Sequence, residues 1–294
     1  MDKLLMVVGM ARSGTTLLAE KLHTIGVSIG EETHALVTPA LDTWCRSDAP
    51  VEELFRLSPR MKPYRHLKDH LEENRPRSTD ELLWALSEGH RQHVGYPLAG
   101  EKTPYHWKHA KRLLSQNPGL HVIFCIRDPR DVIDSHFRVA WGRRCQYALA
   151  REWALVSKLA AHLARTYPGR VRVHNHEAFL HDHERMLAAY KAWLDLGEVP
   201  NRKPLTSFQA DEADWKGDAR KPPNPDKAHA WKRRQGQALR YARYAAIAGK
   251  QLRTHGYETV RAPLGKTLML RLLARGSLFI ENTAKRIVIS QASS

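Results

Sequence analysis

Residues 4–16 read Leu4-Leu5-Met6-Val7-Val8-Gly9-Met10-Ala11-Arg12-Ser13-Gly14-Thr15-Thr16, an apolar run followed at once by a glycine-rich turn. The run predicts a buried strand, and the turn predicts a phosphate loop that opens the next helix. A nucleotide-hydrolysing loop, G-x-x-x-x-G-K-[ST], has a lysine where this chain has Thr15, and the positive charge lies at Arg12 instead. Backbone N–H groups and a helix N-terminus still favour an anion. We therefore expect a phosphate-type ligand here, but not ATP.

A second motif begins where another nearly continuous apolar run ends, at residues 120–126. Such a run is typical of a strand buried on both faces of a parallel sheet. It is followed by Arg127-Asp128-Pro129-Arg130-Asp131, in which Asp128 predicts an N-cap and Pro129 the first helical residue. Arg127 is thus expected at the carboxyl end of a central strand, where ligands bind in open α/β sheets. Ser135 should face it from the new helix, and the pair suits a phosphate monoester.

Together the two motifs resemble those of sulfotransferases that use 3′-phosphoadenosine 5′-phosphosulfate (PAPS) as the sulfuryl donor. The resemblance extends over roughly residues 4–258 and implies an α/β fold of the P-loop-like, three-layer kind, with a central parallel sheet flanked by helices. It implies that Arg127 and Ser135 hold the 3′-phosphate. It also implies a set of loop residues around the 5′-phosphosulfate, namely Arg12, Ser13, Gly14, Thr15 and Thr16.

A third stretch, Gly100-Glu101-Lys102-Thr103-Pro104, precedes Arg127 by a short interval, Lys102 lying 127 − 102 = 25 residues before it. It resembles the G-x-K-[TD]-P element of bacterial and Golgi-type sulfotransferases, which implies that Lys102 is directed at the sulfuryl group. Sulfuryl transfer builds negative charge on the bridging oxygen, so Arg12 and Lys102 are expected to stabilise it without a metal ion. The simpler alternative is a surface lysine beside a turn.

The candidate catalytic base is Glu32, in the segment Gly30-Glu31-Glu32-Thr33. This segment is similar to one in protein-tyrosine sulfotransferases, where the second glutamate is the base that deprotonates the acceptor hydroxyl. His34 stands where that family has an arginine, and it is itself an alternative base. Should neither act, the base would be sought at Glu101 or His106. Two solvated glutamates at the start of a loop are the competing interpretation.

The later part of the chain resembles the family more loosely. Residues 170–174 alternate like a strand, and Glu177 after it is interpreted as a structural residue at the sheet edge. A proline- and lysine-rich loop follows, from Val199 to about Lys227. In the family such a loop closes over the nucleotide, which makes Arg220, Lys221 and Trp231 further candidate donor-binding residues.

Length and composition fit one folded domain. With 294 residues and 42% apolar content, the chain can bury a core as a single domain over residues 1–258, in which residues 35–98 form a helical insertion over the acceptor cleft. Residues 259–294 form a basic amphipathic extension, and residues 264–289 suit peripheral contact with an anionic membrane. Packing of this extension on the domain or on a partner subunit is an equal alternative. The three cysteines form no framework, and neither a signal peptide nor a spanning segment is expected. We expect a cytoplasmic protein, with peripheral placement at the inner membrane surface as the alternative.

The net charge of +16 makes a nucleic-acid-binding protein one rival hypothesis, but no DNA- or RNA-binding signature accompanies the charge. A P-loop kinase is the second rival hypothesis. This chain lacks the lysine that the phosphate loop of such a kinase contains. The 17 histidines include no tight metal-ligand spacing, so no metal site is expected. The acceptor is expected to be a carbohydrate or lipid-linked hydroxyl first, and a tyrosyl or small phenolic hydroxyl second. The sequence leaves the oligomeric state open.

Overall fold

The central sheet is wholly parallel, as predicted. The computed structural model describes residues 3–143, 145–198, 217–234 and 238–259. Within these ranges one sheet has the strand order β2-β3-β1-β4-β5, formed by β1 (Leu4–Gly9), β2 (Val27–Ile29), β3 (Leu98–Lys102), β4 (Leu120–Ile126) and β5 (Val171–Asn175). The strand before the phosphate loop is therefore central, between the strands that carry the other two motifs. All three motifs consequently reach the same edge of the sheet.

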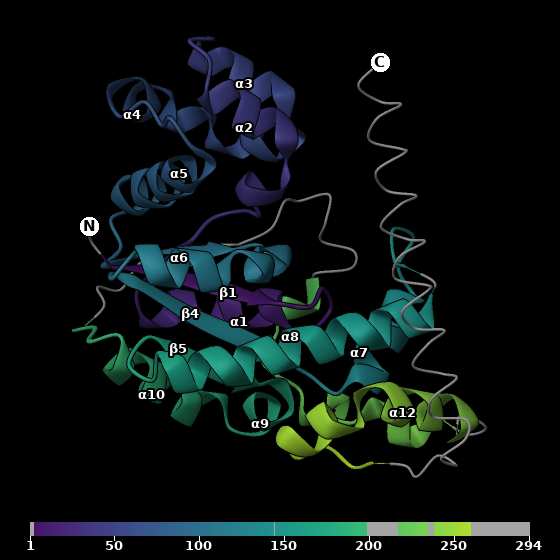
Figure 1. The fold of residues 1–294 in the computed structure, drawn as a ribbon. Coiled ribbons are helices and arrows are strands. Elements are labelled where there is room, and N and C mark those ends of the chain that lie inside the picture. Colours follow the sequence, from purple (N-terminus) through teal and green to yellow (C-terminus); the bar gives the residue numbers. More distant parts are fainter. Residues whose placement is uncertain (1–2, 144, 199–216, 235–237, 260–294) are drawn as a thin grey trace.

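Helices cover both faces of the sheet and complete three layers (Figure 1). On one face lie α1 (Thr15–Leu22), α9 (His176–His181) and α10 (His183–Trp193). On the other lie α6 (Ala110–Gln116), α8 (Gln146–Thr166) and α12 (Ala238–Thr254), and α7 (Pro129–His136) follows β4. Alternate residues of β1 divide between these cores, because successive side chains of a strand point to opposite faces. Met6 packs in one core and Leu5 in the other.

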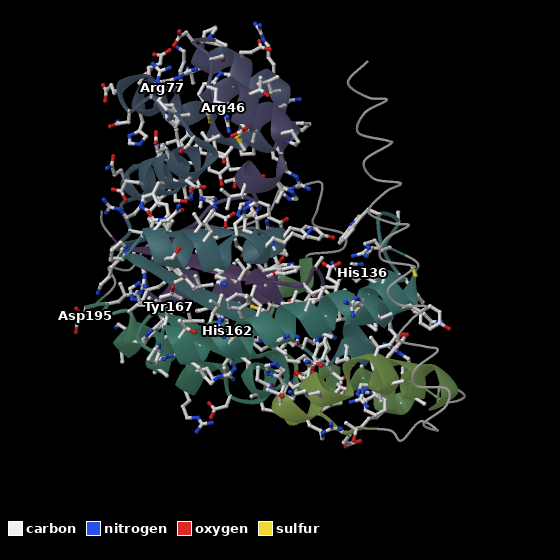
Figure 2. The ribbon with its side chains drawn as sticks, viewed as in Figure 1. Arg46, Arg77, His136, His162, Tyr167 and Asp195 are labelled. Atoms are coloured by element: carbon white, nitrogen blue, oxygen red, sulfur yellow. The ribbon has the colours of Figure 1, made fainter. Side chains whose placement is uncertain are left out.

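The segment between β2 and β3 is largely helical. It contains α2 (Pro39–Cys45), α3 (Val51–Leu57), α4 (Lys68–Glu73), α5 (Thr79–Val94) and a 3₁₀ helix, Pro59–Leu67. These helices stack above the sheet in Figure 1, and their buried leucines belong to the same core as residues of α6, α8 and α12. Arg46 and Arg77, at the outer surface of this insertion in Figure 2, make exposed ion pairs with Asp42 and Asp48.

No helix in the described ranges has both the length and the apolar character needed to cross a membrane. The extension from residue 260 onward, including the membrane-contact segment 264–289, lies outside the described residues, as does most of the loop after Val199.

Candidate active site

The phosphate loop has the backbone that its glycines permit. Gly14 has a φ of 94°, in the left-handed region, and its carbonyl accepts the first helical hydrogen bond from Leu18 N–H at 3.1 Å. A Cβ at Gly14 would come within 2.2 Å of His176 Nδ1, so the buried imidazole and the loop backbone require a glycine here. Ser13 is itself buried, and its N–H donates to the Met10 carbonyl at 3.1 Å. The loop thus opens α1 at Thr15, as predicted.

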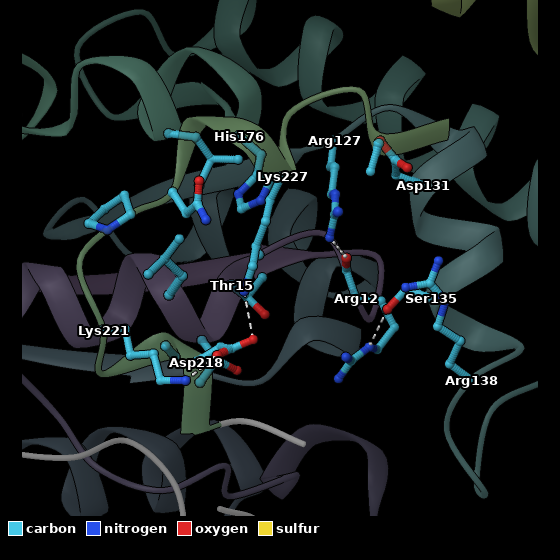
Figure 3. Close-up of a pocket in the computed structure, with 18 of the residues that line it drawn as sticks. Arg12, Thr15, Arg127, Asp131, Ser135, Arg138, His176, Asp218, Lys221 and Lys227 are labelled. Carbon is cyan, nitrogen blue, oxygen red and sulfur yellow. Dashed lines mark hydrogen bonds and ion pairs between the residues drawn. The ribbon is translucent and has the colours of Figure 1, made fainter. Parts of the chain in front are cut away.

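The second motif meets the loop across the sheet edge. Asp128 caps α7 by accepting a hydrogen bond from Arg130 N–H at 2.9 Å. Arg127 Nη1 donates to the Arg12 carbonyl at 3.4 Å, and Arg12 Nε donates to Ser135 Oγ at 3.0 Å (Figure 3). The structure therefore brings together Arg12, Arg127 and Ser135.

These side chains line a cavity of about 560 Å³, which we call the arginine cavity. Its basic side chains are Arg12, Arg127, Arg138, Lys221, Lys227 and Arg234, against the acidic side chains of Asp131 and Asp218. Gly14, Thr15 and Thr16 also line it, whereas Ser13 does not. Burial, followed by the charge of Arg127, lowers the pKa of Arg12, and Glu32 opposes this shift. An anion bound between the two arginines would relieve their repulsion.

Asp131 is the unexpected member of this cavity. Its side chain is 1% exposed and lies 3.9 Å from Arg234 Nη2, and neither carboxylate oxygen has a hydrogen bond within the described residues. Burial raises the pKa of its carboxyl group, so its negative charge is more easily neutralised beside a bound anion.

The late loop contributes differently from what was expected. Lys221 lines the arginine cavity, with its ammonium 3.0 Å from Asp218, but Arg220 and Trp231 are not among the lining residues. The Trp231 ring instead stacks on the Arg130 guanidinium at 3.6 Å, and its Nε1 donates to Asp128 at 2.9 Å. Trp231 therefore fastens the loop that carries Lys227 and Arg234 to the second motif.

Glu32 is held by two cationic or potentially cationic partners. Lys102 Nζ donates to Glu32 Oε1 at 2.5 Å, and His34 Nε2 lies 3.1 Å from Glu32 Oε2. The Lys102 side chain is fully buried and that of Glu32 is 11% exposed. A buried lysine is stable only with a partner, and this one keeps the carboxylate ionised and oriented. Lys102 does not line the arginine cavity, nor the second cavity that is described below.

Glu101 and His106 hold the segment that carries Glu32. Leu36 N–H donates to His106 Nε2 at 3.3 Å, so the imidazole proton lies on Nδ1, which donates to Glu101 Oε2 at 3.1 Å. The hydroxyls of Thr33 and Thr103 donate to the other carboxylate oxygen, at 3.4 and 2.5 Å. The side chains of Glu101 and His106 are almost wholly buried. They do not line the arginine cavity, nor the second cavity that is described next. This geometry favours Glu32 or His34 over Glu101 or His106 as a base.

A second cavity, of about 320 Å³, lies on the other side of the phosphate loop, and we call it the glutamate cavity. It is lined by Ala11, Arg12, Thr15, Thr16, Glu32, His34, Arg60, Pro104, Tyr105 and Trp141. Arg12, Thr15 and Thr16 line both cavities, so the two adjoin at the loop. Arg60 comes from the helical insertion.

Several lining residues were not predicted from the sequence. Asp131 and Ser135 are four positions apart on α7, and this helical spacing could have identified Asp131. Arg234, Arg60 and Trp141 carry no such signal, because only tertiary packing brings them to the loop.

A family model described as "Sulfotransferase family" matches residues 5–200. The chain belongs to the sulfotransferase family. Its fold resembles a sulfotransferase domain from the curacin biosynthetic pathway, with a TM-score of 0.55 and 14% identity over 88% of this chain and 99% of that one. A sulfotransferase domain from the Synechococcus PCC 7002 olefin synthase has a TM-score of 0.48 and 18% identity over 93% of this chain and 94% of that one.

A sulfotransferase from Alicyclobacillus acidocaldarius is 18% identical, with a TM-score of 0.43 over 82% of this chain and 99% of that one. No curated protein sequence matches the chain. Family membership confirms the predicted fold and an enzyme that transfers a sulfuryl group. The site assignments rest on the geometry above.

Proposed function

We propose that this sulfotransferase moves a sulfuryl group from PAPS to an acceptor hydroxyl. The observation that carries the proposal is that the arginine cavity and the glutamate cavity share Arg12, Thr15 and Thr16. A nucleotide donor in the first cavity and an acceptor in the second would meet at these residues. The arginine cavity is strongly basic, as a polyanionic donor requires. The glutamate cavity has one carboxylate among its lining residues, that of Glu32.

The residues of the arginine cavity fit such a donor. Arg127 and Ser135 would hold the 3′-phosphate, and Arg12 with residues 13–16 would hold the 5′-phosphosulfate through side chains and backbone N–H groups. Two adjacent guanidinium groups, one of them with its Nε lacking a hydrogen bond in the described part of the chain, are arranged for an anion. Lys221 and Arg234 would supply further positive charge from the late loop. PAPS would supply the activated sulfuryl group.

In the chemical step, the acceptor oxygen forms a bond to sulfur while the bond from sulfur to the phosphate oxygen breaks. Glu32 takes the hydroxyl proton, which gives a sulfate ester and adenosine 3′,5′-bisphosphate. The Lys102 ion pair keeps Glu32 ionised and therefore able to accept that proton. Arg12 stabilises charge on the leaving phosphate oxygen. Lys102 acts on the reaction through its ion pair with Glu32.

The acceptor would enter the glutamate cavity, beneath the helical insertion at residues 35–98. A carbohydrate or lipid-linked hydroxyl remains our first choice and a phenolic hydroxyl the second. We propose no nucleic-acid partner and no metal ion in the reaction. Placement in the cytoplasm, with peripheral membrane contact through residues 264–289, also remains a proposal.

Transfer of label from ³⁵S-labelled PAPS to a panel of carbohydrate, lipid-linked and phenolic acceptors tests the reaction. Thermal stabilisation by adenosine 3′,5′-bisphosphate, compared with ATP–Mg²⁺ and a DNA duplex, tests the donor site separately. We expect stabilisation by the bisphosphate above that by the other two. Preferential stabilisation by ATP–Mg²⁺ would support a kinase instead, and preferential stabilisation by DNA would support a nucleic-acid-binding protein.

A further inference from the structure

The glutamate cavity has three ring-bearing residues in its lining besides His34. These are Pro104, Tyr105 and Trp141, and Trp141 is 48% exposed. The Trp141 ring lies against the phosphate loop, with the Arg12 guanidinium carbon 5.8 Å from its centroid. Rings stack favourably on such surfaces. A volume of about 320 Å³ is at the lower end of the range for small-molecule sites, which fits one ring and its substituents.

The same cavity contains a cation that the donor site does not use. Arg60 lines the glutamate cavity but not the arginine cavity. Arg12, by contrast, lines both cavities, and its Nε donates to Ser135 Oγ on the side of the arginine cavity. The charge of Arg60 therefore acts on what enters from the acceptor side.

The position of Arg60 is tied to that of Glu32. Arg60 lies at the start of the 3₁₀ helix Pro59–Leu67, where its N–H donates to Ser58 Oγ at 3.3 Å. Four residues later in that helix, the buried Tyr64 donates its hydroxyl proton to the Glu31 carbonyl at 2.5 Å. One short helix therefore carries the cation and also anchors the residue next to the base. The backbone that carries Arg60 is therefore held next to the backbone that carries Glu32, and both residues line the glutamate cavity.

We propose that the acceptor is a hydroxyl-bearing ring that also carries an anionic group, and that Arg60 binds this group while Glu32 faces the hydroxyl. The ring lies against Trp141 and Tyr105. This inference rests on the proposed function, since it assigns the glutamate cavity to the acceptor. The anion is a carboxylate, sulfate or phosphate, to which a guanidinium binds through two parallel hydrogen bonds.

Two matched pairs of probes test the proposal by direct binding. The first is 4-hydroxyphenylacetate and its methyl ester, and the second is methyl β-D-glucuronide and methyl β-D-glucoside; each pair differs in its negative charge. Calorimetry is done on the full chain with and without saturating adenosine 3′,5′-bisphosphate. We expect the anionic member of at least one pair to bind about tenfold tighter or more than its neutral partner. The pair that discriminates identifies the ring as phenolic or pyranose.

Arg60→Met should abolish this preference and Arg60→Lys should retain part of it. The matched control is Arg56→Met, in the same insertion, because Arg56 is exposed, pairs with Glu53 and lines neither the glutamate cavity nor the arginine cavity. Equal binding within both pairs, no binding of any probe, or an unchanged preference in a folded Arg60→Met protein would each overturn the proposal. Binding of the bisphosphate is measured in the same samples, so a failed donor assignment is distinguished from a failed acceptor assignment.

Discussion

The arginine cavity and the glutamate cavity adjoin at one loop but are built in different ways. The first is made by two contiguous motifs at the ends of central strands, joined through Arg12, Arg127 and Ser135. The second gathers Glu32, Arg60 and Trp141 from a loop, an insertion and a surface turn. Side chains fixed by the sheet edge suit a ligand common to a family, whereas an insertion can change without disturbing the sheet. On the proposed function, donor recognition would be part of the fold, and acceptor recognition would be added to it by the insertion.

Arg12→Met should have the largest effect, because Arg12 lines both cavities. Loss of a charged hydrogen bond to the donor costs roughly ten- to a hundredfold in affinity, and loss of a preorganised charge costs roughly 10²–10³ in kcat. We therefore expect kcat/KM to fall by about 10³-fold or more, with both KM for PAPS and kcat affected. A fall in only one of the two would assign Arg12 to one cavity alone and break the proposed junction.

Glu32→Gln should cut kcat by roughly 10²–10⁴, the usual contribution of a positioned general base, while donor affinity stays nearly intact. Glu31→Gln is the matched control, since Glu31 is adjacent but does not line the glutamate cavity. Initial rates on the true acceptor, with calorimetry of adenosine 3′,5′-bisphosphate for each variant, separate lost chemistry from a folding defect.

His34 needs its own variant. Its φ of 52° lies in the left-handed region, which asparagine tolerates, so His34→Asn removes the imidazole with little backbone strain. If His34 is the base, this variant falls by the larger factor and Glu32→Gln is mild. Near-normal turnover in Glu32→Gln would thus reject Glu32 as the base, without affecting the assignment of the arginine cavity to the donor.

The two cavities also differ in what the sequence could predict. β1, the phosphate loop and β4 follow from apolar runs and glycine spacing, and Asp128 caps α7 as its position before Pro129 predicts. These are local properties of the chain, so they are readable from it. Glu32 was reached through a short resemblance, and its pairing with both Lys102 and His34 was not foreseen. That pairing depends on how β3 lies beside the loop after β2.

Arg60, Trp141 and Arg234 were missed for the same physical reason. Each is an ordinary basic or aromatic residue in its local sequence, and it gains a role only from tertiary contacts over long separations. Trp231 is the converse case, since the sequence indicated a role beside the nucleotide but the indole packs on Arg130. Its proposed donor-binding role therefore becomes indirect, through the loop it fastens.

Within the arginine cavity, Arg127→Ala should weaken binding of adenosine 3′,5′-bisphosphate by about ten- to a hundredfold, and Ser135→Ala should weaken it less. The reason is that the guanidinium supplies a charged hydrogen bond, whereas the serine hydroxyl supplies a neutral one. Calorimetry measures both. Unchanged affinity in a folded Arg127→Ala protein would remove the 3′-phosphate assignment, and with it the claim that the arginine cavity is the donor side.

A histidine in the insertion should make the stability of the protein sensitive to acid. Burial, followed by the charge of His66, lowers the pKa of His90 in α5 to about 4, below the ordinary 6.5. The unfolded chain therefore binds one more proton than the folded chain between these values. Stability should fall as the pH drops from 6.5 toward 4, by up to about 1.4 kcal/mol per pH unit from this group. The free energy of unfolding, measured by urea titration at several pH values in this range, should depend less steeply on pH in His90→Leu than in the unmodified protein. An identical pH dependence would exclude His90 as a cause.

Removal of metal ions should have the smallest effect of all, which is none on the rate of sulfuryl transfer in excess EDTA. In phosphoryl transfer Mg²⁺ neutralises charge between donor and leaving group, whereas here Arg12, which lines both cavities, would supply that charge. The described ranges also contain no group of three or more His, Cys, Asp or Glu residues suited to a metal ion. A Mg²⁺-dependent kinase assayed in the same buffer verifies that chelation is complete. Loss of transfer that Mg²⁺ restores would make the arginine cavity a metal–phosphate site, and the charge assigned to Arg12 at the junction of the two cavities would belong to the ion instead.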